Sequence, residues 1–200
     1  MIEEKLRASG ITSIAGVDEA GRGACAGPLV VAAIILRDPS AEILKDVADS
    51  KALSPKKREE LFEVIIDSAI CHSVITIDAE EIDRIGLHRS NLEGMRRAVA
   101  ALKVEPDYVL TDGYAIEGLS LPNLAVWKGD QVALTISAAS IIAKVTRDRM
   151  MFQLDQRYPG YGLADHKGYV TKSHQEAIKK NGVLPIHRRS YSNIAALINT

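Results

Sequence analysis

The sequence has 200 residues, of which 46% are hydrophobic and 26% charged, and its formal net charge is −1. This length and composition predict one globular domain with a sizeable core and exclude a chain that is disordered throughout. The longest uninterrupted apolar run, from Leu29 to Leu36, is far shorter than the roughly twenty residues of a membrane-spanning helix. The N-terminus lacks the basic-then-apolar pattern of a secretory signal, so we expect a cytoplasmic protein with no membrane contact.

Apolar periodicity and capping residues predict strands and helices that alternate along the chain. Strands are expected at the lead-in from Ile11 to Ile14 into the acidic segment that follows, and at Leu29 to Leu36, Ile70 to Ile77, Tyr108 to Leu110 and Leu124 to Trp127. Helices are expected from Pro55 to about Ala69 with Ser54 as cap, from Asp78 to Gly86, along the stripe Leu92, Met95, Val99 and Leu102, from about Val132 to Gln156, and from about Lys172 to Asn181 before Gly182. This order favours an α/β or α+β layered fold in a single domain.

Acidic residues stand at the ends of three of these predicted elements. Asp18 and Glu19 lie between the first two strands, Asp112 follows the strand that begins at Tyr108, and Asp130 precedes the long helix. Four carboxylates brought together would repel one another unless a cation lay between them. Oxygen ligands select Mg²⁺ or Mn²⁺, and two such ions about 4 Å apart would suit the in-line displacement of a phosphodiester.

No competing metal site is predicted from histidine or cysteine. Cys25 and Cys71 lie far apart without Cys-x-x-Cys spacing, so we expect both to be buried small hydrophobic residues. His72, His88 and His174 show no partner pattern and are expected to be structural. The predicted metal site therefore depends on carboxylates alone.

Basic residues are concentrated toward the C-terminus. Residues 144–190 contain ten Lys or Arg against four Asp or Glu, a balance of +6, which leaves 15 basic against 22 acidic residues, a balance of −7, in the rest of the chain. Such a segment is typical of a surface that attracts phosphates, although a solvated charged helix explains the charge equally well.

The order of short motifs along the chain resembles bacterial ribonuclease HII, the type 2 ribonuclease H family. The matching segments, which span nearly the whole chain, are residues 16–23 (GVDEAGRG), 49–51 (DSK), 111–113 (TDG), 128–144 (from KGD to ASIIAK), 158–162 (YPGYG), 166–169 (HKGY) and 187–188 (HR). An Asp-Glu pair beside a glycine turn is by itself most often a solvated loop, but this ordered series is far more specific than any one motif. The departures are small: Ala24-Cys25 stands where larger or Pro-containing pairs are common, and Tyr191 stands where Phe is usual.

The resemblance implies a ribonuclease H-like α/β fold with a mixed five-stranded sheet flanked by helices. It implies one catalytic domain over residues 1–200, in which about 145–200 form a helical, basic, substrate-binding extension. The implied activity is cleavage of the RNA strand of RNA/DNA hybrids and incision 5′ of single ribonucleotides in duplex DNA. The implied mechanism uses two Mg²⁺ or Mn²⁺ ions and leaves 5′-phosphate and 3′-hydroxyl ends. We expect a monomer; recruitment by a replication clamp stays open, because residues 195–200 contain no convincing clamp-binding peptide.

The resemblance also assigns roles to individual residues. Asp18, Glu19, Asp112 and Asp130 match the family's catalytic, metal-binding acids, and Asp18 is expected to touch both ions. Gly21, Arg22 and Gly23 match the segment that reads the ribonucleotide 2′-hydroxyl and the neighbouring phosphate, which fits the close approach that glycine allows. Tyr169 matches the tyrosine that packs on the sugar at the RNA-to-DNA junction.

Other residues receive weaker assignments. Lys51, Ser140, Lys144 and Arg147 are candidates for phosphate contacts, for which ordinary surface charge or a close-packed helix is an equally good explanation. His166 and His187 lie in matched motifs, and we assign them supporting roles rather than catalysis.

Three alternatives compete with the nuclease hypothesis. A non-catalytic nucleic-acid binder would show salt-dependent binding without turnover, but carboxylates placed near phosphate weaken such binding. The hypothesis of a nucleotide-binding α/β enzyme is not supported, because neither of the usual phosphate-binding motifs, Gly-x-Gly-x-x-Gly and Gly-x-x-x-x-Gly-Lys-Ser/Thr, occurs in the sequence. A type 3 ribonuclease H would need an additional N-terminal domain, for which the residues before Gly16 leave no room.

Overall fold

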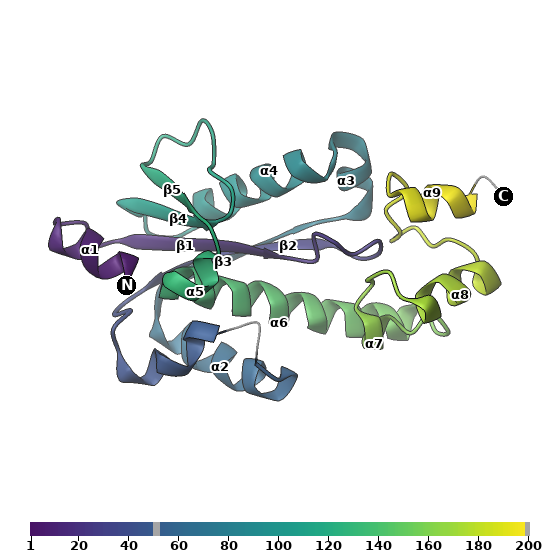
Figure 1. Cartoon of the computed structure of the whole chain (residues 1–200), viewed down its shortest axis with the longest axis horizontal. Helices are drawn as coiled ribbons and strands as arrows, with labels where there is room; N and C mark the ends of the chain where they lie inside the picture. Colours follow the sequence, from purple (N-terminus) through teal and green to yellow (C-terminus); the bar gives the residue numbers. More distant parts are fainter. Residues whose placement is uncertain (50–52, 199–200) are drawn as a thin grey trace.

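A five-stranded sheet with strand order β3-β2-β1-β4-β5 forms the centre of the computed structural model, which describes residues 1–49 and 53–198 (Figure 1). The strands are β1 (Ile14–Ala20), β2 (Leu29–Leu36), β3 (Ala69–Ile77), β4 (Tyr108–Asp112) and β5 (Asn123–Val126). β1 pairs antiparallel with β2 and parallel with β4, so the sheet is mixed. The predicted mixed five-stranded sheet is therefore confirmed.

Helices cover both faces of this sheet. They are α1 (Ile2–Ala8), the 3-10 helix η1 (Glu42–Asp49), α2 (Pro55–Ser68), α3 (Ala79–Ile85), α4 (Leu87–Ala100), α5 (Gly129–Val132), α6 (Leu134–Arg157), α7 (Leu163–His166), α8 (Lys172–Asn181) and α9 (Ser192–Ile198). Figure 1 shows α2 and α6 on one face and α4 on the other. Successive residues of β2 belong alternately to the hydrophobic core on one face and to the core on the other. This explains why the whole sequence of β2 is apolar.

Local capping explains several helix ends. Ser54 accepts a hydrogen bond from the Lys57 backbone N–H at 3.2 Å, and Pro55 takes the first position of α2. Asp78 caps α3 in the same way, and Gly182 ends α8 with a φ of 87°. These predicted ends are confirmed, whereas Leu102 lies beyond the end of α4.

The long helix predicted from about Val132 to Gln156 is divided in two. Ala133 has an extended backbone between α5 and α6. Gly16 of β1 lies so close to this point that a Cβ there would overlap the Thr135 backbone. The buried carboxylate of Glu3 accepts hydrogen bonds from the Thr135 backbone N–H at 2.8 Å and from its hydroxyl at 3.0 Å, and so caps α6 from a distant segment. The break depends on these long-range contacts, which local periodicity does not reveal.

The C-terminal helices pack around the far end of α6. α7, α8 and α9 share a small core that includes Cys25, Met151 and Tyr161 (Figure 1). The predicted start of the extension, about residue 145, lies within α6, so one helix serves both the sheet and these C-terminal elements. The division of the chain into domain and extension remains a prediction.

Two further expectations concern the cysteines and the membrane. Cys25 and Cys71 are both buried and neither forms a disulfide, as predicted. No helix in the described ranges combines the length and the apolar character that crossing a membrane requires.

Candidate active site

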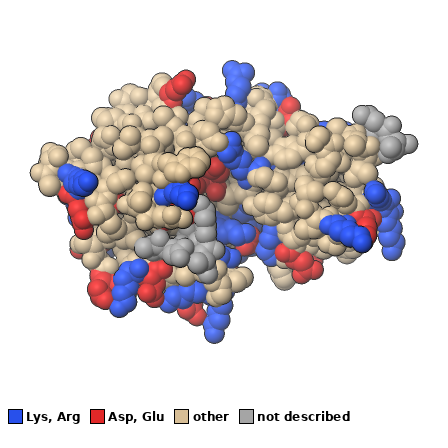
Figure 2. Space-filling view, viewed as in Figure 1, with Lys and Arg blue, Asp and Glu red and all other residues tan. Residues whose placement is uncertain are grey.

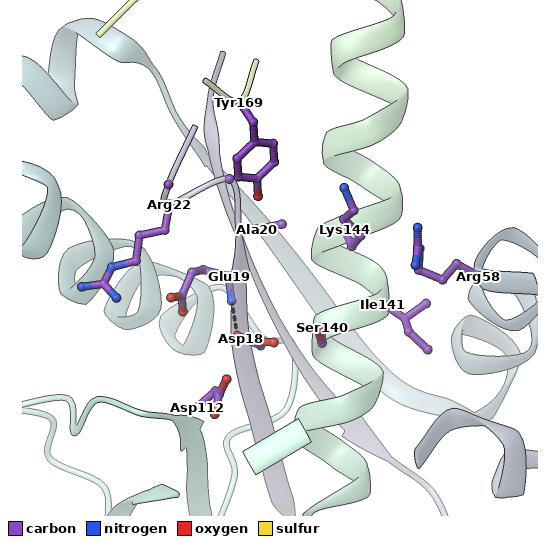
Figure 3. Close-up of a pocket in the computed structure, with 12 residues that line it drawn as sticks. Asp18, Glu19, Ala20, Arg22, Arg58, Asp112, Ser140, Ile141, Lys144 and Tyr169 are labelled. Carbon is purple, nitrogen blue, oxygen red and sulfur yellow. Dashed lines mark hydrogen bonds between the residues drawn. The ribbon is translucent and has the colours of Figure 1, made fainter. Parts of the chain in front are cut away.

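Two of the predicted acids are neighbours across the sheet. β1 and β4 run parallel, and Val17 is opposite Thr111 in their register. The next residue in each strand is acidic, so Asp18 and Asp112 lie at the same edge of the sheet on strands roughly 4.8 Å apart. Glu19 follows directly on β1, and Figure 3 shows the three carboxylates around one space.

These carboxylates line a cavity of about 450 Å³. Its walls are formed by Asp18, Glu19, Ala20, Gly21, Arg22, Gly23, Arg58, Asp112, Ser140, Ile141, Lys144 and Tyr169. In Figure 3, Ser140 and Lys144 project from α6 on one side of this space and Arg22 lies on the other. Figure 2 shows acidic side chains at the bottom of a hollow near the middle of this face, with Lys and Arg side chains beside them. The fold thus brings together residues from β1, β4, α2, α6 and the Tyr169 loop.

Burial and neighbouring negative charges disfavour the charged forms of Asp18 and Glu19. Burial raises the pKa of Asp18 well above its ordinary value, and the charges of Glu19 and Asp112 raise it further. A hydrogen bond from the Ser140 hydroxyl acts in the opposite direction. Burial raises the pKa of Glu19 to about 7, although the charge of Arg22 and a hydrogen bond with the Asn91 side chain both act to lower this pKa. A divalent cation would relieve this repulsion.

The donor atoms fit a hard divalent ion. All of the acidic donors are oxygens, and Oε2 of Glu19 is buried without a hydrogen-bond partner in the part of the chain that the structure describes. As the side chains stand, no three His, Cys, Asp or Glu residues within 1–49 and 53–198 are grouped closely enough to hold a metal ion.

Asp130 lies next to this group but not on the cavity wall. It belongs to α5 and is only 2% exposed. The backbone N–H of Gly129 donates a hydrogen bond to Oδ1 of Asp112 at 2.8 Å, which ties the turn carrying Asp130 to the carboxylate on β4. The carbonyl of Asp130 accepts a hydrogen bond from the Ser137 hydroxyl, which fixes this turn on α6.

The glycine segment and Tyr169 form the opposite wall. Gly21 has a φ of 89°, and a Cβ at this position would overlap the side chain of Arg147. A Cβ at Gly23 would lie 3.7 Å from the Tyr169 ring, which is 39% exposed. Only glycine at position 21 fits both the backbone conformation and the space.

Arg147 does not lie in the cavity, contrary to the predicted phosphate contact. It is completely buried, and its guanidinium donates hydrogen bonds to the carbonyls of Pro28, Lys167 and Ala26 at 2.9, 2.8 and 3.1 Å. The guanidinium carbon also lies 5.6 Å from the centre of the Tyr169 ring. Its donors are used inside the protein, so Arg147 supports the Tyr169 loop instead of binding substrate directly.

The remaining phosphate candidates have different outcomes. Lys144 lines the cavity and forms an ion pair with Asp148 at 2.7 Å. Lys51 lies outside the described residues. Arg58, which the sequence analysis missed, reaches the cavity from α2 and donates a hydrogen bond to the Leu53 carbonyl at 2.6 Å. Its sequence context, the Lys-Lys-Arg run at 56–58, did not distinguish it from its basic neighbours.

A relay of two histidines holds the loop that carries Tyr169, and the hydrogen-bond partners assign the tautomers. Nδ1 of His187 accepts a hydrogen bond from the Leu184 backbone N–H at 2.8 Å, so its proton is on Nε2 and faces Nε2 of His174 at 3.2 Å. The proton of His174 is then on Nδ1 and is donated to the Tyr169 carbonyl at 3.0 Å.

A third imidazole completes this support. His166 stacks on His174 with ring centres 4.1 Å apart, accepts the Gly168 N–H on Nδ1 and donates from Nε2 to the Tyr161 carbonyl. Burial lowers the pKa of His174 and lowers that of His187 to about 4. The supporting role predicted for His166 and His187 therefore extends to His174.

The comparisons with known proteins agree on one family. The Ribonuclease HII family model matches residues 15–194. A Ribonuclease HII from Corynebacterium jeikeium (strain K411) is 54% identical over 196 residues, which cover 98% of this chain and 94% of the relative. The crystal structure of the ribonuclease H2 from Pyrococcus horikoshii OT3 matches with a TM-score of 0.81 and 32% identity, covering 94% of this chain and 97% of that one. The RNase HII in a PCNA:RNase HII complex from Archaeoglobus fulgidus gives a TM-score of 0.76 at 29% identity, covering 90% and 96%. The ribonuclease H-like fold is confirmed.

Proposed function

The chain belongs to the ribonuclease HII family of metal-dependent nucleases that cut the RNA strand of RNA/DNA hybrids, and we propose that it also incises 5′ of single ribonucleotides in duplex DNA. The observation that carries this proposal is the cavity that joins the carboxylates of β1 and β4 to the Gly21–Gly23 segment. Acids suited to phosphodiester hydrolysis thus lie beside a backbone that can approach a sugar closely.

The acids have the first role in this proposal. Asp18, Glu19, Asp112 and Asp130 would hold Mg²⁺ or Mn²⁺, with two ions during the reaction. The chemistry supplied by the bound ions would be Lewis acidity at the phosphate and a lowered pKa of the attacking water. Support for Asp130, which lies outside the cavity wall, comes from the Gly129 hydrogen bond that links its turn to Asp112. The products carry 5′-phosphate and 3′-hydroxyl ends.

Recognition of the ribonucleotide depends on the wall of the cavity formed by the glycine segment and Tyr169. We assign the reading of the 2′-hydroxyl to the backbone of Gly21, Arg22 and Gly23 and to the Arg22 side chain, because this hydroxyl is what separates RNA from DNA at one position. Tyr169 packs on the sugar at the junction, held there by His174. Lys144, Ser140 and Arg58, on the α2 and α6 side of the cavity, contact the phosphates.

Partners beyond the nucleic acid remain predictions. The Archaeoglobus fulgidus relative is described in a complex with PCNA, which supports clamp recruitment as a proposal for this chain. The monomeric state is likewise a prediction.

A direct assay tests the proposed function. The protein is incubated with Mg²⁺ and an end-labelled DNA duplex containing one ribonucleotide, and an all-DNA duplex of the same sequence serves as the control. We expect a single cut on the 5′ side of the ribonucleotide and none in the control. Failure to cut by a folded protein that has also been tried with Mn²⁺, or equal cutting of both duplexes, would contradict the proposal.

A further inference from the structure

A second cavity opens beside the catalytic one. Its volume is about 400 Å³, and it shares Glu19, Arg22 and Asp112 with the first cavity. Its other walls are formed by Gly113, Tyr114, Trp127 and Lys128. When a nucleic-acid strand has its scissile phosphate over the carboxylates, the neighbouring nucleotide of that strand is therefore within reach of this second cavity.

Trp127 presents an exposed indole to this cavity from a fixed turn. It is 81% exposed, although Trp side chains gain much of their stabilising effect from burial. The following residue, Lys128, has the left-handed φ of 53° that non-glycine residues rarely adopt. Hydrogen bonds from the Gly113 N–H to the Val126 carbonyl at 3.0 Å and from the Gly129 N–H to Asp112 hold both sides of the turn. The turn that carries the indole is thus hydrogen-bonded to the carboxylate of Asp112.

Cationic groups accompany the aromatic ones. The Arg22 guanidinium lies 4.5 Å from the centre of the Tyr114 ring, and its Nε is buried without a hydrogen-bond partner among the described residues. Lys128 adds a second positive charge on the cavity wall. Aromatic faces beside Arg and Lys are the combination by which proteins bind nucleotides of a strand, through stacking and phosphate neutralisation.

We propose that this second cavity is a subsite for one nucleotide of the strand being cut, next to the scissile phosphate, with the Trp127 indole packed against its base and sugar. This inference rests on the proposed function, because it requires a strand held over Asp18 and Asp112. The same-strand assignment follows from the shared walls of the two cavities.

Trp127 is the sole tryptophan of the chain, so its fluorescence reports on this subsite alone. An Asp18→Asn variant, whose changed residue borders only the catalytic cavity, is titrated with the ribonucleotide-containing duplex in Mg²⁺ so that binding is measured without cutting. We expect a saturable change in fluorescence. Kd is compared between variants in the same background by the anisotropy of a dye-labelled duplex, because substitution of Trp127 removes the only tryptophan. Trp127→Ala is expected to raise Kd about five-fold or more, and Trp127→Phe to restore most of the affinity. Val104→Ala, which trims an exposed apolar side chain elsewhere, leaves Kd unchanged.

Gapped duplexes identify the strand. Removing the nucleotide next to the cut site from the cut strand is expected to abolish the fluorescence change and the effect of Trp127→Ala on Kd, whereas the matching gap in the opposite strand leaves both. Tight binding with unchanged fluorescence overturns the inference and leaves the surface to another occupant, such as a protein. Dependence on the opposite strand also overturns it. If the unmodified protein neither binds nor cuts the duplex, the proposed function itself has failed.

Discussion

Nε2 of His174 lies 3.2 Å from Nε2 of His187, and this contact connects the C-terminal segment to the residue proposed to hold the substrate sugar. His187 donates to His174, which in turn donates to the carbonyl of Tyr169. Each ring is neutral and has one nitrogen that donates and one that accepts. The position of Tyr169 therefore depends on two imidazoles that do not touch the cavity.

Replacing His174 tests this positioning role. His174→Asn keeps an N–H donor near the place of Nδ1, whereas His174→Leu removes both ring nitrogens. We expect His174→Leu to raise KM for the ribonucleotide duplex more than it lowers kcat, with partial recovery in His174→Asn. The measurement is steady-state cleavage with thermal unfolding as control. Equal kinetic effects in two equally stable variants would contradict the relay.

The pH dependence of stability provides a second test. Burial and the neighbouring His174 and His166 lower the pKa of His187 to about 4; the Tyr161 ring and the Cys25 thiol lie at the same cluster. The unfolded state then binds more protons than the folded state, so stability is lost as pH falls from about 6.5 toward 4. The loss is on the order of 2–3 kcal/mol for this group.

Urea unfolding at pH 7 and at pH 4.5 measures this loss. His187→Gln cannot take up the proton, so its stability should fall less between the two pH values than that of the unchanged protein. Parallel losses in both proteins would show that His187 does not titrate as inferred.

Glu19 should show the opposite dependence. Its pKa is raised from 4.5 to about 7, so the folded state binds more protons than the unfolded state, and stability falls as pH rises through this window. At pH 8 without divalent ions, Glu19→Gln should therefore be more stable, by on the order of 1–3 kcal/mol, and near pH 4.5 the difference should vanish.

Added Mg²⁺ should stabilise the unchanged protein more than the Glu19→Gln variant. Metal binding to the folded state should raise the melting temperature of the unchanged protein at pH 8 more than that of Glu19→Gln. Thermal unfolding in chelator and in Mg²⁺ measures both effects. A variant that is less stable in chelator at pH 8 would contradict the raised pKa of Glu19, for which burial is the main cause.

Local rules predicted the elements better than the contacts between them. The apolar run of β2 and the caps Ser54 and Asp78 were readable because neighbouring residues determine them. The break at Ala133 was not, because it depends on Glu3 and Gly16, more than a hundred residues away.

The same distinction applies to the candidate site. Acids at strand ends could be predicted to converge, because the carboxyl ends of parallel strands meet at one edge of a sheet. A long side chain such as Arg58 can reach the cavity only through the packing of α2 on the sheet, and the burial of Arg147 follows from three distant carbonyls. The sequence therefore supplied the acids, but not all of the groups around them.

Arg147 should matter for stability more than its exposed neighbour. Arg147→Met removes the donor from three carbonyls, of which those of Pro28 and Ala26 are buried, at a cost of about 1–3 kcal/mol for each buried group left unsatisfied. Arg149→Met, two residues along α6, removes an exposed ion pair with Glu59 that contributes about 0–1 kcal/mol. Urea unfolding of both variants compares the two, and a similar small loss in each would contradict the structural role of Arg147.

We infer that acids from β1 and β4 act together as one metal-dependent cutting site. Single-turnover cleavage of the ribonucleotide-containing duplex, measured across Mg²⁺ concentrations for the unchanged protein and for Asp112→Asn, distinguishes a joint site from acids that act separately. We expect the variant to cut more than about a hundred-fold more slowly at every concentration. In chelator it should remain folded and be as stable as the unchanged protein or slightly more so, because one repelling charge is gone. A folded Asp112→Asn protein that cuts at the unchanged rate would contradict the account.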